Sequence, residues 1–131
     1  MAATTLDRNT PRRDGLQTPF KVAAGELIPA GVMVCVNAAG FLVNAKVATG
    51  LVYIGRADAR VDNTAGQDGD AVMPVDHGRM FAWDNDGTVD QSFIGKLVYI
   101  ADNHTVSATD TGSSPAGTCF MVDDLGIWTL A

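Results

Sequence analysis

Residues 96–101, Lys-Leu-Val-Tyr-Ile-Ala, and residues 105–107, Thr-Val-Ser, decide the fold class of this chain. β-Branched and aromatic residues are frequent in both segments, and such residues favour β-strands. The Asp-Asn-His sequence between them is typical of a tight turn, because short polar side chains hydrogen-bond to the nearby backbone there. The pattern therefore predicts a β-hairpin over residues 96–107.

The same pattern recurs from Phe20 to the end of the chain, where short apolar runs alternate with clusters of Gly, Asn and Asp. Residues 20–24 and 51–59 are expected to form strands, and residues 109–117 a flexible connection. Only residues 44–50 leave room for a helical turn. Three further hairpins are predicted, which join residues 32–36 to 41–43, 71–75 to 78–83, and 118–122 to 126–130.

The acidic residues are almost all aspartates: of 15 acidic side chains, only Glu26 is a glutamate. Aspartate favours turns and caps, whereas glutamate favours helix interiors. The 14 glycines and five prolines also disfavour long helices. We therefore predict an all-β fold, a compact antiparallel β-sandwich or small barrel of jelly-roll or tulip-like form, with an extended N-terminal arm and little helix.

The chain divides by composition into an arm and a body. Residues 1–21 are polar, interrupted by prolines and without a strand or helix period, so we interpret them as an extended N-terminal arm. Residues 22–131 form one β-rich body domain, for which this length suffices. The arm carries four basic and two acidic side chains, whereas the body carries five basic and 13 acidic ones. Because non-specific nucleic-acid binding depends on Lys and Arg, we expect none here.

Cellular location is constrained by what the chain lacks. No apolar run is long enough to cross a bilayer, and the first residues have no apolar segment of a secretory signal, so we expect no membrane contact and no export by that route. Cys35 and Cys119 lie in apolar segments far apart in the sequence. We expect both to be buried free thiols in a reducing compartment.

Catalytic and metal-binding patterns are weak. His77 and His104 each follow an acidic or polar turn residue, without the spacing of a metal site, so we interpret them as residues of solvent-exposed turns. Residues 112–117 lack the spacing of a nucleophile elbow, and residues 50–56 lack the Lys and Ser/Thr of a phosphate-binding loop. We therefore expect no enzyme, no cofactor and no metal centre.

Two aspartate-rich segments, residues 62–70 and 84–90, are dense in the oxygen ligands that Ca²⁺ prefers. Neither has the EF-hand pattern, since Glu26 is far from both. Tight turns explain these segments, and a weak Ca²⁺ site is the alternative.

Several apolar side chains are candidates for contacts with a partner. Leu6, Leu16 and Phe20 are too widely spaced to build a core of their own, so they could anchor the arm on another protein. Phe81, Trp83 and Trp128 serve either the core or an oligomer or capsid contact, because tryptophans at strand ends are frequent interface anchors.

The order of several short motifs resembles that of the bacteriophage head-decoration, or capsid cement, proteins of the lambda type. The resemblance covers about residues 22–130. Its motifs are Ala-Gly-Val-Met-Val (30–34) before a hairpin at Gly40, Gly-Arg-Ala (55–57), Asp-Asn-Thr (62–64) with Gly-Asp (69–70), Met-Phe-Ala-Trp-Asp-Asn (80–85), Val-Tyr-Ile-Ala-Asp (98–102) with Thr-Val-Ser (105–107), Ala-Gly (116–117) and Gly-Ile-Trp (126–128).

This resemblance implies a non-catalytic viral structural protein. It would bind the outside of an expanded HK97-type capsid, at the outer surface of the virion, and clamp adjacent major capsid subunits together. It would assemble as a homotrimer, or alternatively as a homodimer. We expect the arm to lie along the capsid protein, with Arg8, Arg12 and Arg13 facing acidic capsid residues and Leu6, Pro11, Leu16 and Phe20 among its contacts.

A second interpretation is a small β-barrel module that binds a ligand such as a carbohydrate. It would use Trp83 and Trp128 as an aromatic platform, with the aspartate-rich loops as a polar rim.

Overall fold

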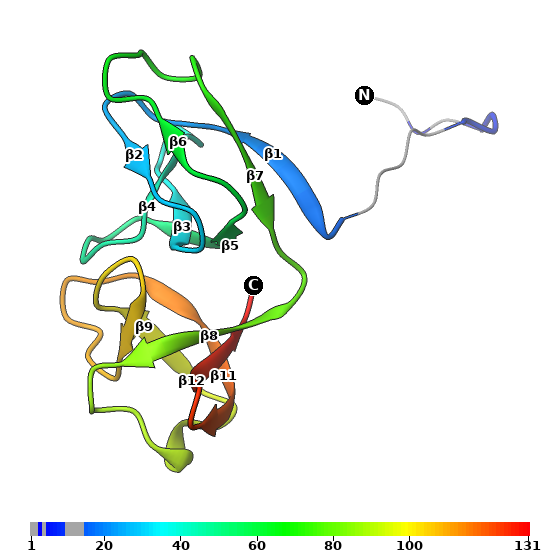
Figure 1. Cartoon of the computed structure of the whole chain (residues 1–131). Helices are drawn as coiled ribbons and strands as arrows, with labels where there is room; N and C mark the ends of the chain where they lie inside the picture. Colours follow the sequence, from blue (N-terminus) through cyan, green and yellow to red (C-terminus); the bar gives the residue numbers. More distant parts are fainter. Residues whose placement is uncertain (1–2, 4, 10–14) are drawn as a thin grey trace.

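The computed structural model describes residues 3, 5–9 and 15–131 (Figure 1). The all-β prediction with little helix is confirmed, and no described helix is long and apolar enough to cross a membrane. The elements in chain order are β1 (Gln17–Lys21), β2 (Leu27–Ile28), β3 (Met33–Val36), β4 (Leu42–Asn44), β5 (Val52–Ala57), β6 (Val61–Asp62), β7 (Val72–Asp76), β8 (Met80–Asn85), the 3₁₀ helix η1 (Gln91–Phe93), β9 (Leu97–Ile100), β10 (Thr105–Ser107), β11 (Pro115–Asp123) and β12 (Gly126–Leu130).

The N-terminal half of the body is a five-stranded sheet in the order β1-β7-β5-β3-β4. Both of its faces are covered, which explains the unbroken apolar sequence of β3. Met33 and Cys35 enter one hydrophobic cluster, whereas Val34 enters a second one, because successive side chains of a strand point to opposite faces. The second cluster is closed by Ile28 of β2, a strand that pairs with β6.

The C-terminal half is a closed barrel in the order β10-β8-β12-β11-β9. β8 and β10 pair in parallel, whereas the other neighbouring strands pair antiparallel. The hairpins predicted at residues 96–107 and 118–130 are both confirmed, although β11 begins at Pro115, inside the stretch that we expected to be flexible. The barrel interior holds Trp83, Val98 and Ile127, together with other apolar residues.

The sheet and the barrel share one hydrophobic cluster, to which both Met33 of the sheet and Trp83 of the barrel belong. Tyr53 of β5 joins the two halves: its hydroxyl oxygen accepts hydrogen bonds from Trp83 Nε1 at 3.1 Å and from Thr129 Oγ1 at 3.3 Å. A Cβ at Gly117 of β11 would lie 3.2 Å from the Tyr53 ring. A glycine there therefore lets the ring of one half approach the backbone of the other.

The hairpin predicted at residues 71–83 is wrong, although its two strands exist. β7 pairs with β1 and β5 in the sheet, whereas β8 pairs with β12 and β10 in the barrel. At the crossing, the His77 N–H donates to Leu16 O and the Gly78 N–H donates to Ala131 O. The chain therefore passes from one half to the other at this turn, because its polar groups find partners distant in sequence.

Two smaller expectations change, and a third is confirmed. Residues 17–21 form β1 and pair with β7 along their whole length, so the strand expected at residues 20–24 starts at Gln17 and ends at Lys21, and the arm predicted over residues 1–21 ends before it. The short helical turn lies at Gln91–Phe93, where Asp90 caps it, and not at residues 44–50. The hairpin at residues 32–43 is confirmed, and Asn37 Oδ1 accepts from the N–H groups of Ala39 and Phe41 in its turn.

Both cysteines are buried and free, as predicted. Burial raises the pKa of the Cys35 thiol from 9.0 to about 12 and also raises that of Cys119. The two thiols therefore behave as small core side chains.

Candidate functional site

The arm is anchored where the chain crosses between the sheet and the barrel. Gln17 Nε2 donates to Asp76 Oδ1 at 2.9 Å, and Thr18 Oγ1 lies 2.7 Å from His77 Nε2. The Phe20 ring contacts the His77 ring edge-on, with centroids 6.4 Å apart. His77 is thus half-buried in a contact with β1 and is not an exposed turn residue.

Two of the expected arm residues therefore belong to the body. Phe20 packs against the second hydrophobic cluster. Leu16 lies against Gly78, where an added Cβ would come within 3.1 Å of Leu16 Cδ2. Leu6 is 78% exposed and Arg8 is also exposed, whereas Pro11, Arg12 and Arg13 lie outside the described residues.

The three aromatic residues predicted as contacts have different environments. Trp83 is 4% exposed and lies inside the barrel, so it is a core residue, and the prediction that it forms a contact is wrong. Phe81 is half-buried, with its ring 6.1 Å from that of Trp83. Trp128 is on the outside of the barrel, where its Nε1 donates to Asp123 Oδ1 at 2.9 Å. Trp83 and Trp128 therefore do not form the platform expected of a carbohydrate module.

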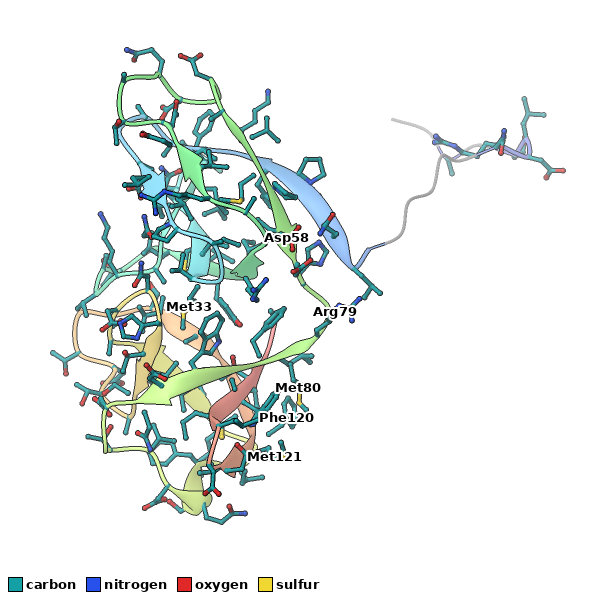
Figure 2. The ribbon with its side chains drawn as sticks, in the orientation of Figure 1. Met33, Asp58, Arg79, Met80, Phe120 and Met121 are labelled. Carbon is teal, nitrogen blue, oxygen red and sulfur yellow. The ribbon has the colours of Figure 1, made fainter. Side chains whose placement is uncertain are left out.

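An exposed apolar surface covers the outside of the barrel over three adjacent strands (Figure 2). We call it the barrel face. The β8 and β12 residues on it pair directly across the strands, as Met80 with Leu130 and Ala82 with Trp128, and Met121 of β11 pairs with Trp128. The barrel face consists of Met80, Ala82, Phe120, Met121, Trp128 and Leu130.

A β-bulge enlarges the barrel face. The register of β11 against β12 shifts between Cys119 and Met121, so the intervening Phe120 has no partner residue. Phe120 and Met121 are consequently both exposed, at 48% and 39%, although neighbours on a regular strand point to opposite sides. Figure 2 shows the two side chains together with Met80 on one side of the barrel.

Charged residues lie at the two ends of the barrel face. Arg79 precedes Met80 at one end. Asp84 lies at the other end, next to the β11–β12 turn that carries Asp123 and Asp124. The face therefore has an apolar centre, a basic end and an acidic end.

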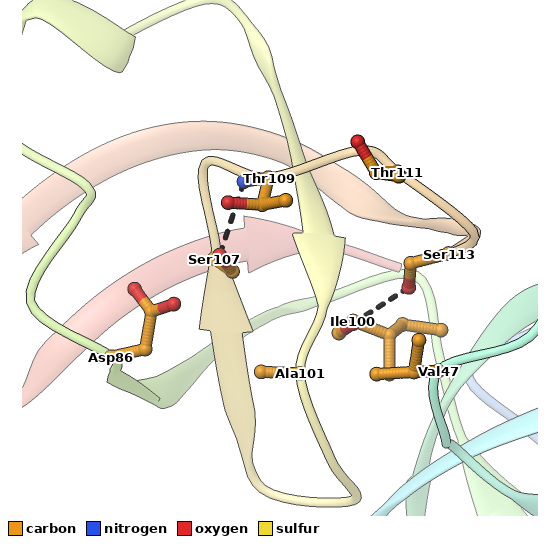
Figure 3. Close-up of a pocket in the computed structure, with 8 residues that line it drawn as sticks. All are labelled: Val47, Asp86, Ile100, Ala101, Ser107, Thr109, Thr111 and Ser113. Carbon is orange, nitrogen blue, oxygen red and sulfur yellow. Dashed lines mark hydrogen bonds between the residues drawn. The ribbon is translucent and has the colours of Figure 1, made fainter.

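A cavity of about 290 Å³ lies elsewhere on the barrel, where Val47 and Ile100 meet the segment that carries Ser107 to Ser113 (Figure 3). Its polar lining is mostly hydroxyl groups. Ser113 Oγ donates to Ile100 O at 2.6 Å, and Ser107 Oγ accepts from the Thr109 N–H at 3.0 Å. The hydroxyl groups of Ser107 and Ser113 therefore already have partners within the protein.

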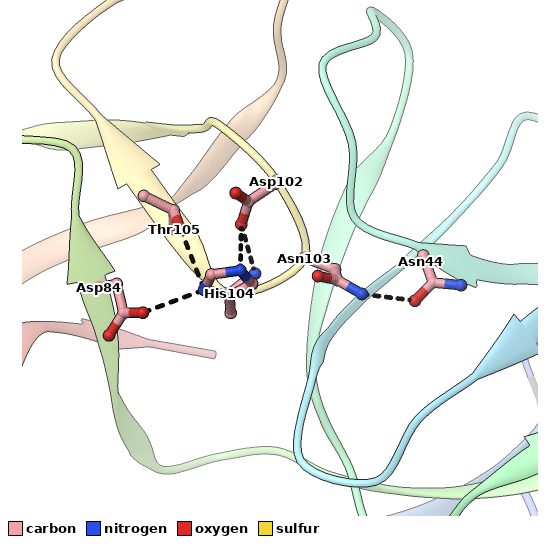
Figure 4. Close-up of polar contacts among 6 residues, drawn as sticks. All are labelled: Asn44, Asp84, Asp102, Asn103, His104 and Thr105. Carbon is pink, nitrogen blue, oxygen red and sulfur yellow. Dashed lines mark hydrogen bonds and ion pairs between the residues drawn. The ribbon is translucent and has the colours of Figure 1, made fainter.

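His104 takes part in an exposed polar cluster (Figure 4). Its Nδ1 lies 3.0 Å from Asp84 Oδ2, and its Nε2 lies 3.5 Å from Asp102 Oδ1. These contacts connect β8 to the β9–β10 turn, where the Asp84 N–H also donates to His104 O. Because all three side chains are more than half exposed, the cluster contributes little to stability.

The aspartate-rich loops use their carboxylates within each loop. Thr64 Oγ1 and N–H both donate to Asp62, and these hydrogen bonds lower the pKa of that carboxyl. Hydrogen bonds from Ser92 lower the pKa of Asp90 in the same way. Within residues 3, 5–9 and 15–131, no group of three or more His, Cys, Asp or Glu side chains is arranged to hold a metal ion.

Comparison of the chain with protein-family models, with curated proteins and with solved structures finds no match.

Proposed function

We propose that this chain is a viral structural protein, a decoration or cement protein that binds the outer surface of an expanded HK97-type phage capsid. In this role it clamps adjacent major capsid subunits and catalyses no reaction. The order of motifs along residues 22–130, which resembles that of lambda-type decoration proteins, is the first support.

The observation that carries the proposal is the position from which the arm leaves the body. The arm precedes β1, an edge strand of the sheet, and β1 is fixed to β7 by pairing from Gln17 to Lys21. An edge strand such as β1 can be extended by recognition through strand addition, in which main-chain hydrogen bonds supply affinity. In the proposed complex, residues 1–14 lie along the capsid protein while the body keeps its fold.

The arm is basic, so it would be attracted to an acidic surface. Arg8, Arg12 and Arg13 outnumber Asp7 and Asp14 within residues 1–16, whereas the body is acidic. In the proposed complex the three arginines face acidic residues of the capsid protein. Such contacts accelerate association and weaken as ionic strength rises.

Co-sedimentation with capsids tests the proposal. The full chain is mixed with expanded heads that lack it and, in parallel, with unexpanded proheads of the same phage. We expect saturable binding to expanded heads only. Absence of binding to both would overturn the proposal and leave a ligand-binding module as the next candidate, to be tested by a glycan screen.

A truncation tests the arm separately. Deleting residues 2–14 keeps β1 and Leu16 in place, so the body retains its sheet pairing. We expect this variant to lose most of its capsid binding while its thermal unfolding changes little. The matched control replaces Lys46, an exposed cation of the body, by alanine. Undiminished binding by the truncated chain would remove the arm from the mechanism.

A further inference from the structure

We propose that the barrel face binds a second copy of this chain by two-fold symmetric packing, so that the unit that decorates the capsid is a homodimer. The pairing deepens the proposed function, on which it rests for its role at the capsid, but it is a property of the free protein. Three features of the face support it.

The first feature is size. Met80, Phe120, Met121 and Leu130 are each between 39% and 48% exposed, and Trp128 adds a half-buried indole. Together these side chains leave roughly 400 Å² of apolar surface in contact with water, the size of patch that marks an interaction site. A standard interface buries about 800 Å² per partner, of which about 60% is apolar. The face therefore supplies most of the apolar part of such an interface.

The second feature is composition. Methionine, phenylalanine and tryptophan are enriched in interfaces, whereas lysine, glutamate and aspartate are depleted at interface centres. Four of the six residues of the barrel face belong to the first group, Ala82 and Leu130 complete it, and the charged residues are at its margin. Trp128 adds an aromatic anchor, because its hydrogen bond to Asp123 holds the indole in one orientation.

The third feature is the order of the charges, which identifies the partner. Arg79 lies at one end of the face, and Asp84, Asp123 and Asp124 lie at the other. A two-fold axis through the centre of the face places the basic end of each copy against the acidic end of the other. One patch then satisfies both copies, as a two-fold interface requires. A head-to-tail ring would instead need a second, complementary patch.

The oligomeric state of the full chain tests this inference without any capsid. Sedimentation velocity over a series of concentrations should show a monomer–dimer equilibrium. Leu130→Lys should weaken the dimer about 30-fold, the usual effect of losing an interface hot spot. Val72→Lys is the matched control: Val72 is 53% exposed on β7 of the sheet, against 48% for Leu130, and should leave the dimer unchanged.

A charge exchange tests the two-fold geometry. Arg79→Glu and Asp124→Arg should each weaken the dimer, because each places like charges opposite one another across the axis. The double variant Arg79→Glu/Asp124→Arg should recover the wild-type dimer. Circular dichroism spectra and thermal unfolding of each variant confirm that it is folded.

Each outcome decides the question. A monomer at every concentration, a trimer, equal weakening by Leu130→Lys and Val72→Lys, or a double variant weaker than both single variants would overturn the two-fold pairing. A dimer that fails to bind expanded heads would overturn the proposed function and leave the pairing intact. A monomer that binds expanded heads would overturn the two-fold pairing and leave the proposed function intact.

Discussion

Replacing Tyr53 by phenylalanine removes one oxygen atom from the joint between the sheet and the barrel. That oxygen accepts hydrogen bonds from Trp83 Nε1 and Thr129 Oγ1. Trp83 is 4% exposed and Thr129 is fully buried, so both donors would lose their partner away from solvent. An unsatisfied buried donor costs about 1–3 kcal/mol. We therefore expect Tyr53→Phe to lower the free energy of unfolding by about 3 kcal/mol.

A loss of this size is readily measured in a domain of this length. The total stability of such domains is about 5–15 kcal/mol, and the substitution should lower the melting temperature by about 10 °C. Denaturant unfolding followed by tryptophan fluorescence gives the free energy directly. The slope of that free energy against denaturant concentration should stay unchanged, because the surface exposed on unfolding is the same.

The matched control is Tyr99→Phe in β9, since no hydrogen bond of the Tyr99 hydroxyl is found within the described part of the chain. It should cost less than about 0.5 kcal/mol. Combining Tyr53→Phe with Thr129→Val should cost about 1 kcal/mol less than the sum of the two single changes, because the valine leaves no orphaned hydroxyl. If Tyr53→Phe lowers the free energy of unfolding by less than about 1 kcal/mol, the hydrogen bonds of this hydroxyl do not hold the sheet and the barrel together.

Three further substitutions follow from the core and the turns. The pKa of the Cys35 thiol is 9.0 in the unfolded chain and about 12 in the folded one. The contribution of the neutral thiol to the free energy of unfolding is therefore complete below pH 9 and is lost as the pH rises through 12. Between pH 8 and 10 the free energy of unfolding should fall by about 1 kcal/mol because of this thiol. Denaturant titrations of Cys35→Ala should show a smaller fall over the same pH range, and an unchanged fall would contradict the burial argument. Gly126→Ala should lower the free energy of unfolding by about 3 kcal/mol, because the added Cβ would lie 2.3 Å from Trp83 O at a φ of 136°. The control Gly87→Ala places its Cβ in open space and should cost about 1 kcal/mol. Equal melting temperatures of the two variants would contradict the predicted clash with Trp83. Asn63→Ala should cost about 3 kcal/mol, because the buried amide nitrogen lies within 3.3 Å of three backbone carbonyl oxygens; a change below about 1 kcal/mol by calorimetry would exclude that role.

The strands were predictable where their signals are local. In the hairpin of residues 32–43, the apolar run of β3 and the Asn37 turn lie next to each other in the sequence, and the Asn37 side chain bonds within that turn. The fold class follows from such segments, because each needs only its own residues to form.

The assignment of strands to sheets was not predictable. The Asp76-His77-Gly78 sequence has the composition of a hairpin turn, but the partners of its N–H groups are Leu16 and Ala131, which no local pattern indicates. β1 was predicted only in part, because the strand expected at residues 20–24 overlaps it at Phe20 and Lys21 alone. Only Thr18 and Phe20 of that strand are turned towards the core, so an edge strand looks like a polar arm.

The candidate site was only partly accessible to sequence reasoning. The alternation of Met80 with Ala82 and of Trp128 with Leu130 is the signal of one exposed side on each strand, and it could have identified the barrel face once β8 and β12 were paired. The bulge at Phe120 could not have been found in this way, because an unbroken apolar run gives no sign of a register shift. Trp83 and Trp128 each lie between an apolar and a polar neighbour in the sequence, and only the structure separates the buried Trp83 from the half-buried Trp128 on the outside of the barrel.

The most direct test of the central claim is a cryo-electron microscopy reconstruction of expanded phage heads saturated with the full chain. We expect added density on the outer surface of the shell, with the β-body bridging adjacent capsid subunits and residues 1–14 lying along one of them. An undecorated shell at saturating concentrations of the chain would contradict it.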